Sequence, residues 1–211
     1  KYYRKDISTT IKILKYIFPM NNIELKRTIC GVDEVGRGTL AGPVVASAVI
    51  LARGHKIEGL KDSKKLTSIR RVKLSKIIQK NALSIGIGII DATIIDKINI
   101  KQATLLAMSN SVKDLSLIPD IVLIDGVDKI NIPHPQKNII GGDSKEDSIM
   151  AASIIAKVER DKLMDIYART YPDFGFEKNK GYGTKFHLNA LKINEPTPIH
   201  RMTFKPLKNK Y

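Results

Sequence analysis

The sequence predicts an α/β domain with a helical C-terminal part. Short apolar segments rich in β-branched residues come first, and longer segments with helical spacing lie between and after them. Glycine and proline separate the two kinds of segment. This order is typical of a sheet covered by helices.

Five segments have the composition of strands. The second of them consists of small and β-branched residues, so we expect it to be buried. The expected strands cover residues 28–35, 43–51, 82–90, 121–125 and 137–140.

Helical spacing marks four further segments. The first is basic and amphipathic, with Ile69, Val72, Ile77 and Ile78 as its apolar positions. The expected helices cover residues 67–80, 99–115, 147–170 and 184–193.

The length of 211 residues fits one domain with a sizeable core, preceded by an arm. We expect residues 1–26 to be an N-terminal extension, in which the apolar residues from Ile11 to Phe18 have helical spacing. Residues 27–211 then form the domain, including its helical C-terminal part.

The chain has 36 Lys and Arg residues and 21 Asp and Glu residues, which gives a formal net charge of +15. Such an excess favours a polyanionic partner such as nucleic acid. An anionic membrane surface, or a lysine-rich surface that serves solubility alone, is the alternative.

Cys30 is the only cysteine, which excludes an internal disulfide and a Cys-rich zinc site. No apolar run approaches the roughly 18 residues of a spanning helix, so we expect a soluble, cytoplasmic protein without membrane contact.

Carboxylates lie at or just beyond the C-terminal ends of three of the expected strands, each beside glycine: Asp33-Glu34, Asp125 and Asp143. Ligands of open α/β sheets collect at such strand ends. Carboxylates that converge there repel one another unless divalent cations supply counter-charge, and two Mg²⁺ ions can activate a water and stabilise a leaving oxygen. The alternative is that Asp ends strands because it suits turns. Neighbouring strand residues point to opposite faces, so Asp33 and Glu34 share a site only if the strand breaks near Gly36.

Several motifs together resemble the signature of bacterial ribonuclease HII, a type 2 ribonuclease H. They occur in family order from about residue 29 to the end of the chain, and their number and length make the resemblance specific. The matching segments are GVDEVGRGTLAGPVV (31–45), DSKKL (62–66), IDG (124–126), GDS (142–144), AASIIAKVERD (151–161) and KGYGT (180–184), with His187, His200 and Arg201.

The resemblance implies a ribonuclease H-like fold, a central mixed sheet flanked by helices, for residues 27–211. It also implies an endonuclease that hydrolyses the RNA strand of RNA–DNA hybrids and cuts 5′ of single ribonucleotides embedded in duplex DNA. The expected product ends are 3′-hydroxyl and 5′-phosphate, and the expected cofactor is Mg²⁺ or Mn²⁺, with two ions bound in the presence of substrate. Such an activity implies roles in DNA repair and in RNA primer removal during replication.

By this resemblance Asp33, Glu34, Asp125 and Asp143 are the metal-binding catalytic carboxylates. They are the same four residues that the strand-end argument selects.

Three further groups are implied to bind substrate. The Gly36-Arg37-Gly38 loop resembles the segment that senses the ribose, since glycines permit close backbone approach and a 2′-OH can be tested by backbone groups. Tyr182 resembles the tyrosine that packs on the sugar after the ribonucleotide. Ser63 and Lys64 would contact phosphate. The alternatives are a plain turn, a half-buried loop tyrosine and a solvated lysine.

Two positions depart from the family pattern. Thr39 and Gly183 stand where members often have proline, which predicts a less rigid ribose-sensing loop and a looser Tyr182. Lys157 and Arg160 could face DNA or solvent. We expect His187 and His200 to be structural.

Two other functions share part of this pattern. A junction-resolving nuclease of the same broad fold would have the acidic cluster without needing Gly36-Arg37-Gly38 or Tyr182, and a hybrid-binding module would bind without cutting. The intact acidic set disfavours the second. We expect a monomer, and contact with a replication clamp stays open.

Overall fold

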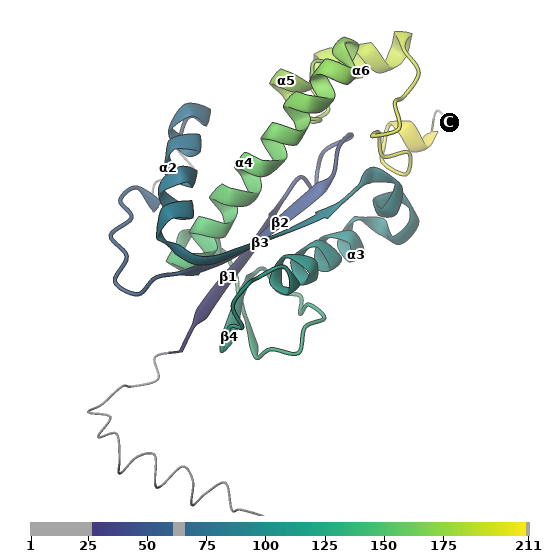
Figure 1. Cartoon of the computed structure of the whole chain (residues 1–211). Helices are drawn as coiled ribbons and strands as arrows, with labels where there is room; N and C mark the ends of the chain where they lie inside the picture. The colour runs from purple at the N-terminus through teal and green to yellow at the C-terminus, as the bar shows by residue number, and fades with distance from the viewer. Residues whose placement is uncertain (1–26, 61–65, 210–211) are drawn as a thin grey trace, which may run out of the picture.

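The computed structural model describes residues 27–60 and 66–209. The expected N-terminal extension and two of the expected phosphate contacts, Ser63 and Lys64, lie outside the described residues. Figure 1 shows the described part as a sheet between helices, with a helical region at one end.

The sheet has five strands in the order β3-β2-β1-β4-β5. The pairs β1–β2 and β2–β3 are antiparallel, whereas β1–β4 and β4–β5 are parallel. The mixed sheet of the prediction is therefore confirmed, and each strand lies within one residue of its expected bounds. The strands are β1 (Ile29–Val35), β2 (Val44–Leu51), β3 (Ala82–Ile90), β4 (Ile121–Asp125) and β5 (Gln136–Ile139).

Helices cover both faces of this sheet (Figure 1). Helices α2 (Ser68–Asn81) and α4 (Asp147–Thr170) share one core cluster with Val49 of β2. Helix α3 (Ala92–Lys113) packs on the opposite face, against a cluster that includes Val32 of β1. Because strand side chains alternate, Asp33 points to the face covered by α4.

Small residues let the helices approach the sheet closely. A Cβ added at Gly31 of β1 would lie 2.2 Å from the backbone carbon of Ser148 in α4. At Gly88 of β3 it would lie 1.9 Å from the carbonyl oxygen of Ala107 in α3. Glycine at these positions sets the distance between the layers.

Helix α2 presents a different face to the core from the one its sequence suggested. Ile69, Val72 and Ile77 are exposed by 70%, 40% and 44%, whereas Leu74 and Ile78 are buried. Of the four apolar positions named in the prediction, only Ile78 is buried. The assignment of this helix was right, and the assignment of its apolar face was largely wrong.

Helix α3 begins earlier than expected and contains a break. Asp91 caps its first turn, accepting a hydrogen bond from the N–H of Ile94 at 2.8 Å. At Asn99 the backbone is non-helical, with φ of 65°, and the Asn99 side chain accepts from the N–H of Gln102 at 3.1 Å. The expected start at residue 99 is thus the cap of the second segment, and the segment before it was missed.

Beyond α4 the chain forms the expected helical C-terminal region, located in Figure 1 at the far end of α4. Its core contains Phe174, Phe176 and Leu191, which pack together with Met164 of α4. The short helix α5 was not predicted. Among the described residues, no helix has the length and apolar character needed to span a membrane. The region comprises η3 (Pro172–Phe174), α5 (Phe176–Asn179), α6 (Lys185–Ile193) and η4 (Leu207–Asn209).

Candidate active site

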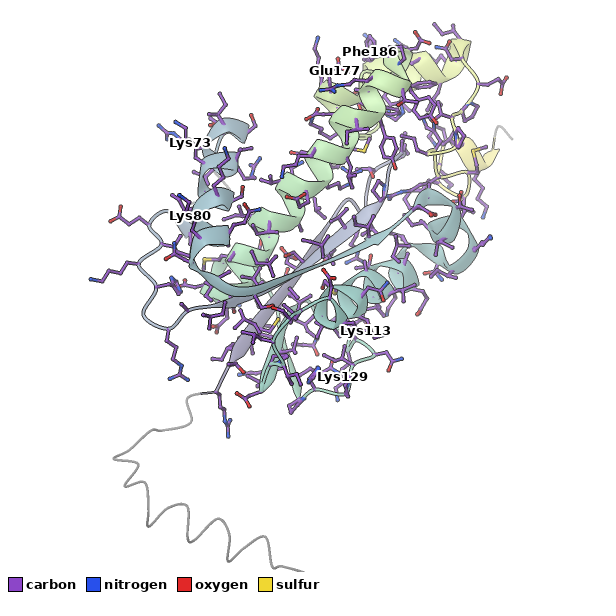
Figure 2. The ribbon with its side chains drawn as sticks, in the orientation of Figure 1. Lys73, Lys80, Lys113, Lys129, Glu177 and Phe186 are labelled. Carbon is purple, nitrogen blue, oxygen red and sulfur yellow. The ribbon has the colours of Figure 1, made fainter. Side chains whose placement is uncertain are left out.

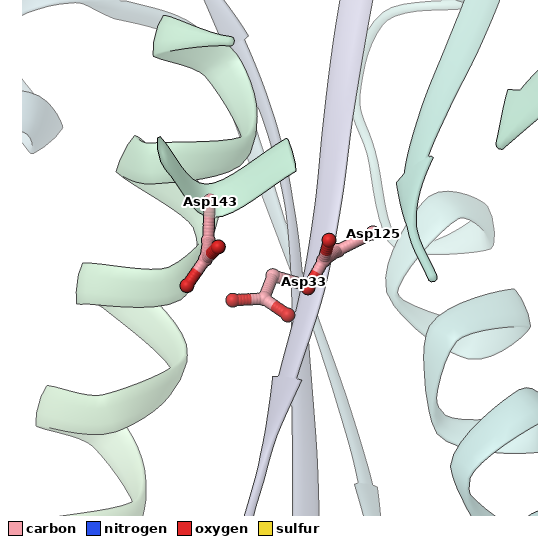
Figure 3. A group of neighbouring side chains, drawn as sticks. All are labelled: Asp33, Asp125 and Asp143. Atoms are coloured by element: carbon pink, nitrogen blue, oxygen red, sulfur yellow. The ribbon is translucent and has the colours of Figure 1, made fainter. Parts of the chain in front are cut away.

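Three aspartates meet beside the parallel strands β1 and β4. Asp33 lies in β1, Asp125 ends β4, and Asp143 lies in the short turn η2 (Gly142–Ser144) just before α4. One carboxylate oxygen from each lies within 4.8 Å of the others. Figure 3 shows the three side chains pointing toward one another.

Backbone amides hold these carboxylates in place. The N–H of Gly142 donates to Asp125 Oδ1 at 2.8 Å, and the N–H of Glu34 donates to Asp33 Oδ1 at 2.8 Å. Gly141 adopts a left-handed conformation with φ of 66°, which favours glycine and turns the chain into η2. The glycine pair thus returns Asp143 to the neighbourhood of the strand ends.

The electrostatics of Asp33 favour a bound cation. This side chain is only 5% exposed, and burial raises its pKa well above the usual range, with further increases from the charges of Glu34 and Asp125. A hard divalent cation prefers carboxylate oxygens and would supply the missing counter-charge. The donor set of Asp33, Asp125 and Asp143 therefore fits such an ion.

Glu34 lies beside this group and is not one of the three. The strand does not break after Asp33, because its pairing with β2 continues through Glu34 and Val35. The Glu34 carboxylate forms an ion pair with Arg37 at 3.3 Å. Burial raises the Glu34 pKa, Arg37 lowers it, and the charge of Asp125 raises it. Glu34 thus interacts with Asp33 and Asp125, and the structure groups three of the four expected carboxylates.

The two glycines of the Gly36-Arg37-Gly38 loop differ in their surroundings. At Gly36, φ is 94° and an added Cβ would lie 2.2 Å from Arg160 Nε, so packing within the chain requires glycine. At Gly38, which is exposed, an added Cβ would meet no heavy atom within 4 Å. Packing within the described chain therefore does not require a glycine at position 38.

The sequence suggested that Arg160 faces DNA or solvent. This was wrong, because Arg160 is completely buried. Its position follows from a spacing that the sequence analysis overlooked. Ala152, Ala156, Arg160 and Met164 recur every four residues along α4, and all four are buried. The guanidinium donates to the carbonyl oxygens of Pro43, Ala41 and Lys180 and to Thr39 Oγ1, at 2.8–3.1 Å.

A second buried arginine, Arg201, also binds the Gly36-Arg37-Gly38 loop. It donates to the carbonyl oxygens of Gly36 at 2.6 Å, Arg37 at 2.9 Å and Gly42 at 2.9 Å. Burial, followed by the charge of Arg160, lowers the pKa of Arg201 to about 9. The family motif contained this residue, but its sequence context gave no indication of its role.

Tyr182 lies on the loop before α6, and its side chain is 44% exposed. Its N–H donates to the carbonyl oxygen of Asn179 at 2.9 Å, and its own carbonyl is bonded to His187 Nδ1 at 2.9 Å. His187 and His200 are both buried and are joined through their Nε2 atoms at 3.0 Å. Burial and this pairing agree with the structural role expected of them, and His187 holds the backbone at Tyr182.

Comparison with known proteins decides the family. The family described as Ribonuclease HII matches residues 30–207. The chain belongs to the ribonuclease HII family. Ribonuclease HII of Bacillus subtilis (strain 168) is 54% identical over 183 residues, which cover 87% of this chain and 71% of that protein. Ribonuclease HII of Geobacter sulfurreducens is 52% identical over 182 residues, covering 86% of this chain and 84% of that protein.

Solved structures agree with this fold. Ribonuclease H2 from Pyrococcus horikoshii OT3 has a TM-score of 0.75 at 24% identity and covers 86% of this chain and 96% of that one. In the PCNA:RNase HII complex from Archaeoglobus fulgidus, the matching chain has a TM-score of 0.72 at 25% identity, with coverage of 84% and 95%. Membership in the ribonuclease HII family makes the chain a metal-dependent ribonuclease H, a hydrolase that cuts RNA in RNA–DNA duplexes.

Proposed function

We propose that this member of the family also cuts on the 5′ side of a single ribonucleotide embedded in duplex DNA, leaving 3′-hydroxyl and 5′-phosphate ends. The observation that carries this proposal is the meeting of Asp33, Asp125 and Asp143 near the Gly36-Arg37-Gly38 loop, which has an exposed and sterically open glycine. The first group supplies hydrolysis, and the second supplies selection of the ribose.

Asp33, Asp125 and Asp143 would hold the metal, and Glu34 would contribute from the side of Arg37. Two Mg²⁺ or Mn²⁺ ions bound there would help to activate the attacking water and to stabilise the leaving 3′ oxygen. The chain's own part is to keep the carboxylates oriented before substrate arrives. The amides of Gly142 and Glu34 do this for Asp125 and Asp33.

Ribose selection falls to the Gly36-Arg37-Gly38 loop. A 2′-OH both donates and accepts hydrogen bonds, so backbone groups close to the sugar can distinguish ribose from deoxyribose. Two carbonyls of the loop are occupied by Arg201, and this fixes the loop in advance. The open space at Gly38 permits the approach of the sugar.

Tyr182 would pack on the sugar that follows the ribonucleotide. Its ring is partly exposed, and its backbone is anchored by Asn179 and His187. A ring held in this way would favour a deoxyribose at that position, and so an RNA–DNA junction. Ser63 and Lys64 remain expected phosphate contacts.

In the cell such an enzyme would remove ribonucleotides during DNA repair and RNA primers during replication. We expect it to act in the cytoplasm as a monomer. The solved complex of the Archaeoglobus fulgidus relative with PCNA supports contact with a replication clamp as a further expectation.

The deciding experiment uses duplex DNA that carries one ribonucleotide, incubated with Mg²⁺, Mn²⁺ or a chelator. The expected result is one metal-dependent cut on the 5′ side of the ribonucleotide, mapped at nucleotide resolution. Asp125→Asn should lower the rate constant of cleavage by about a hundredfold or more, since it weakens the charge compensation of the metal. Cutting on the 3′ side, cutting in chelator, or near-normal turnover of the variant would refute the assignment.

Two control substrates test the other functions. A four-way DNA junction should not be cut, whereas a junction-resolving nuclease would cut it. All-DNA duplex should remain intact under every condition. Binding of a hybrid without any metal-dependent cutting would indicate a binding module and contradict the proposal.

A further inference from the structure

Thr39 joins the ribose-sensing loop to a buried arginine. Its side chain is completely buried. The hydroxyl donates to the carbonyl oxygen of Gly36 at 3.1 Å and accepts from Arg160 Nη2 at 2.9 Å. The directions are fixed, because a guanidinium can only donate and a carbonyl can only accept.

The same arginine reaches the loop that carries Tyr182. Arg160 Nη1 donates to the carbonyl oxygen of Lys180 at 2.8 Å. A backbone hydrogen bond of 2.8 Å from the N–H of Leu40 to the carbonyl oxygen of Gly181 joins the same two segments. Residues near positions 36–40 and 180–182, far apart in the sequence, are thus connected by this backbone bond and through the Arg160 guanidinium and the Thr39 hydroxyl.

We propose that Thr39 is a positioning residue that fixes the ribose-sensing loop relative to Tyr182 through Arg160. By keeping the two in register, it sets the preference of the enzyme for a single ribonucleotide followed by DNA over a continuous RNA strand. This inference rests on the roles proposed above for Gly36-Arg37-Gly38 and Tyr182.

Burial gives the hydroxyl its importance. Arg160 makes four hydrogen bonds in a completely buried setting, and loss of the Thr39 acceptor would leave a charged N–H without that partner. The guanidinium or the loop must then shift. Gly36 packs directly against this guanidinium, since an added Cβ there would lie 2.2 Å from Arg160 Nε, so a shift of the guanidinium would displace the loop.

A shift of this kind should affect the two substrates unequally. At a single ribonucleotide, the loop and Tyr182 must engage two adjacent sugars of different kinds at once. A continuous RNA strand offers a 2′-OH at every position and lacks the deoxyribose that Tyr182 selects. Misalignment of the two loops should therefore reduce cleavage at the single ribonucleotide more strongly.

The test measures single-turnover cleavage rates on two duplexes of one sequence, one with a single ribonucleotide and one with a continuous RNA strand. In Thr39→Val, which keeps the shape and removes the hydroxyl, the ratio of the two rates should fall about tenfold, equivalent to about 1.4 kcal/mol. Thr39→Ser, which keeps the hydroxyl, should restore the ratio. Thr39→Cys, with a weaker donor and acceptor, should give an intermediate ratio and keeps the proposal testable if valine is not tolerated.

Thr104→Val is the matched control. Thr104 is also buried, and its hydroxyl donates to the carbonyl oxygen of Ile100 at 2.8 Å within α3, on the other face of the sheet. In Thr104→Val the ratio of the two cleavage rates should equal that of the unmodified protein. An unchanged ratio in Thr39→Val, a failure of Thr39→Ser to restore it, or an equal fall in Thr104→Val would overturn the proposal. Failure of the unmodified protein to cut at a single ribonucleotide would instead refute the proposed function on which the inference rests.

Discussion

Asp33 combines two unfavourable features that a catalytic carboxylate in a metal site can tolerate. It is almost fully buried, and the negative charges of Glu34 and Asp125 add to the effect of burial in raising its pKa. Ionisation would be costly for a residue that served the fold alone. A divalent cation removes this cost, so the arrangement is understandable as part of a metal site.

Tyr182 offers a test of junction recognition at the level of one side chain. Tyr182→Phe keeps the ring and should retain most of the cleavage at a single ribonucleotide. Tyr182→Ala removes the packing surface and should lower that rate by about two- to tenfold, in line with the 0.5–1.5 kcal/mol of an aromatic contact. Single-turnover rates on a single-ribonucleotide duplex and on a long hybrid give the comparison. An equal loss on both substrates would argue against a role at the junction.

At the scale of elements, the contact between β1 and α4 places the site. An added Cβ at Gly31 would lie 2.2 Å from the backbone carbon of Ser148 and 2.3 Å from the backbone nitrogen of Ile149, so backbone would have to move. Gly31→Ala should therefore lower the free energy of unfolding by about 1–3 kcal/mol. It should also slow cleavage, because Asp33 is two residues farther along β1. Urea denaturation and a cleavage assay measure the two effects, and a variant as stable as the unmodified protein would contradict this account of the packing.

The histidine pair connects α6 with the C-terminal segment and should make stability depend on pH. His187 Nδ1 is bonded to the carbonyl oxygen of Tyr182, so Nδ1 carries the proton of this ring. Its Nε2 therefore accepts a hydrogen bond from His200 Nε2. His200 Nδ1 in turn accepts from the N–H of Thr197 at 2.9 Å. Both rings are therefore neutral. Burial, followed by the charge of His187, lowers the pKa of His200 to about 4 from the usual 6.5, and burial also lowers the pKa of His187.

The sign of the effect follows from proton binding. Between pH 6.5 and about 4 the unfolded chain binds more protons at His200 than the folded chain, so the free energy of unfolding should fall as the pH falls through this range. The His200 contribution is at most roughly 3 kcal/mol. Denaturant unfolding at pH 7 and pH 5 would measure it. His134→Gln, outside this pair, should keep the pH dependence, and His200→Gln should weaken it.

The sequence predicted the elements better than their faces. Strand bounds were within one residue, since composition and turn residues mark them locally. The apolar residues of α2 did not reveal which side is buried, because Ile69 and Val72 are exposed on a helix whose core contacts come from Leu74 and Ile78. Arg160 was missed for a related reason. The four-residue spacing along α4 marks its position, but its partners are carbonyls of two distant loops, which no local pattern encodes.

The candidate site was predicted in part for physical reasons that can be stated. Glycines beside Asp125 and Asp143 mark turns after strands, and adjacency of the parallel strands brings Asp33 and Asp125 together. The alternation of side chains made the sharing of one site by Asp33 and Glu34 conditional on a break, and the strand continues without one. Convergence of the three aspartates was therefore predictable, whereas the ion pair of Glu34 with Arg37 required the structure.

At the scale of the whole molecule, the two faces of the sheet have different relations to the site. Asp33 points to the face covered by α2 and α4, and α3 covers the other face. Helix α2 contributes five basic residues and no acidic one (Arg70, Arg71, Lys73, Lys76 and Lys80). In Figure 2, Lys73 and Lys80 extend from α2, whereas Lys113 and Lys129 lie on the side of α3. Substrate bound at the aspartates would thus lie on the same side of the sheet as the basic residues of α2.

This difference predicts how salt affects binding. The binding constant for a hybrid should fall linearly on a log–log plot against salt concentration, with a slope of about −0.9 for each phosphate contact neutralised. Replacing Lys73 and Lys80 by Gln should weaken binding and reduce the slope by about one to two units. The same change at Lys113 and Lys129, equally exposed lysines near α3, removes the same charge and should leave the slope unchanged. Fluorescence titrations in chelator, where no cutting occurs, give the slopes. If the two pairs lowered the slope equally, the net charge of +15 would act as a diffuse field and α2 would have no preferred contact with the phosphates.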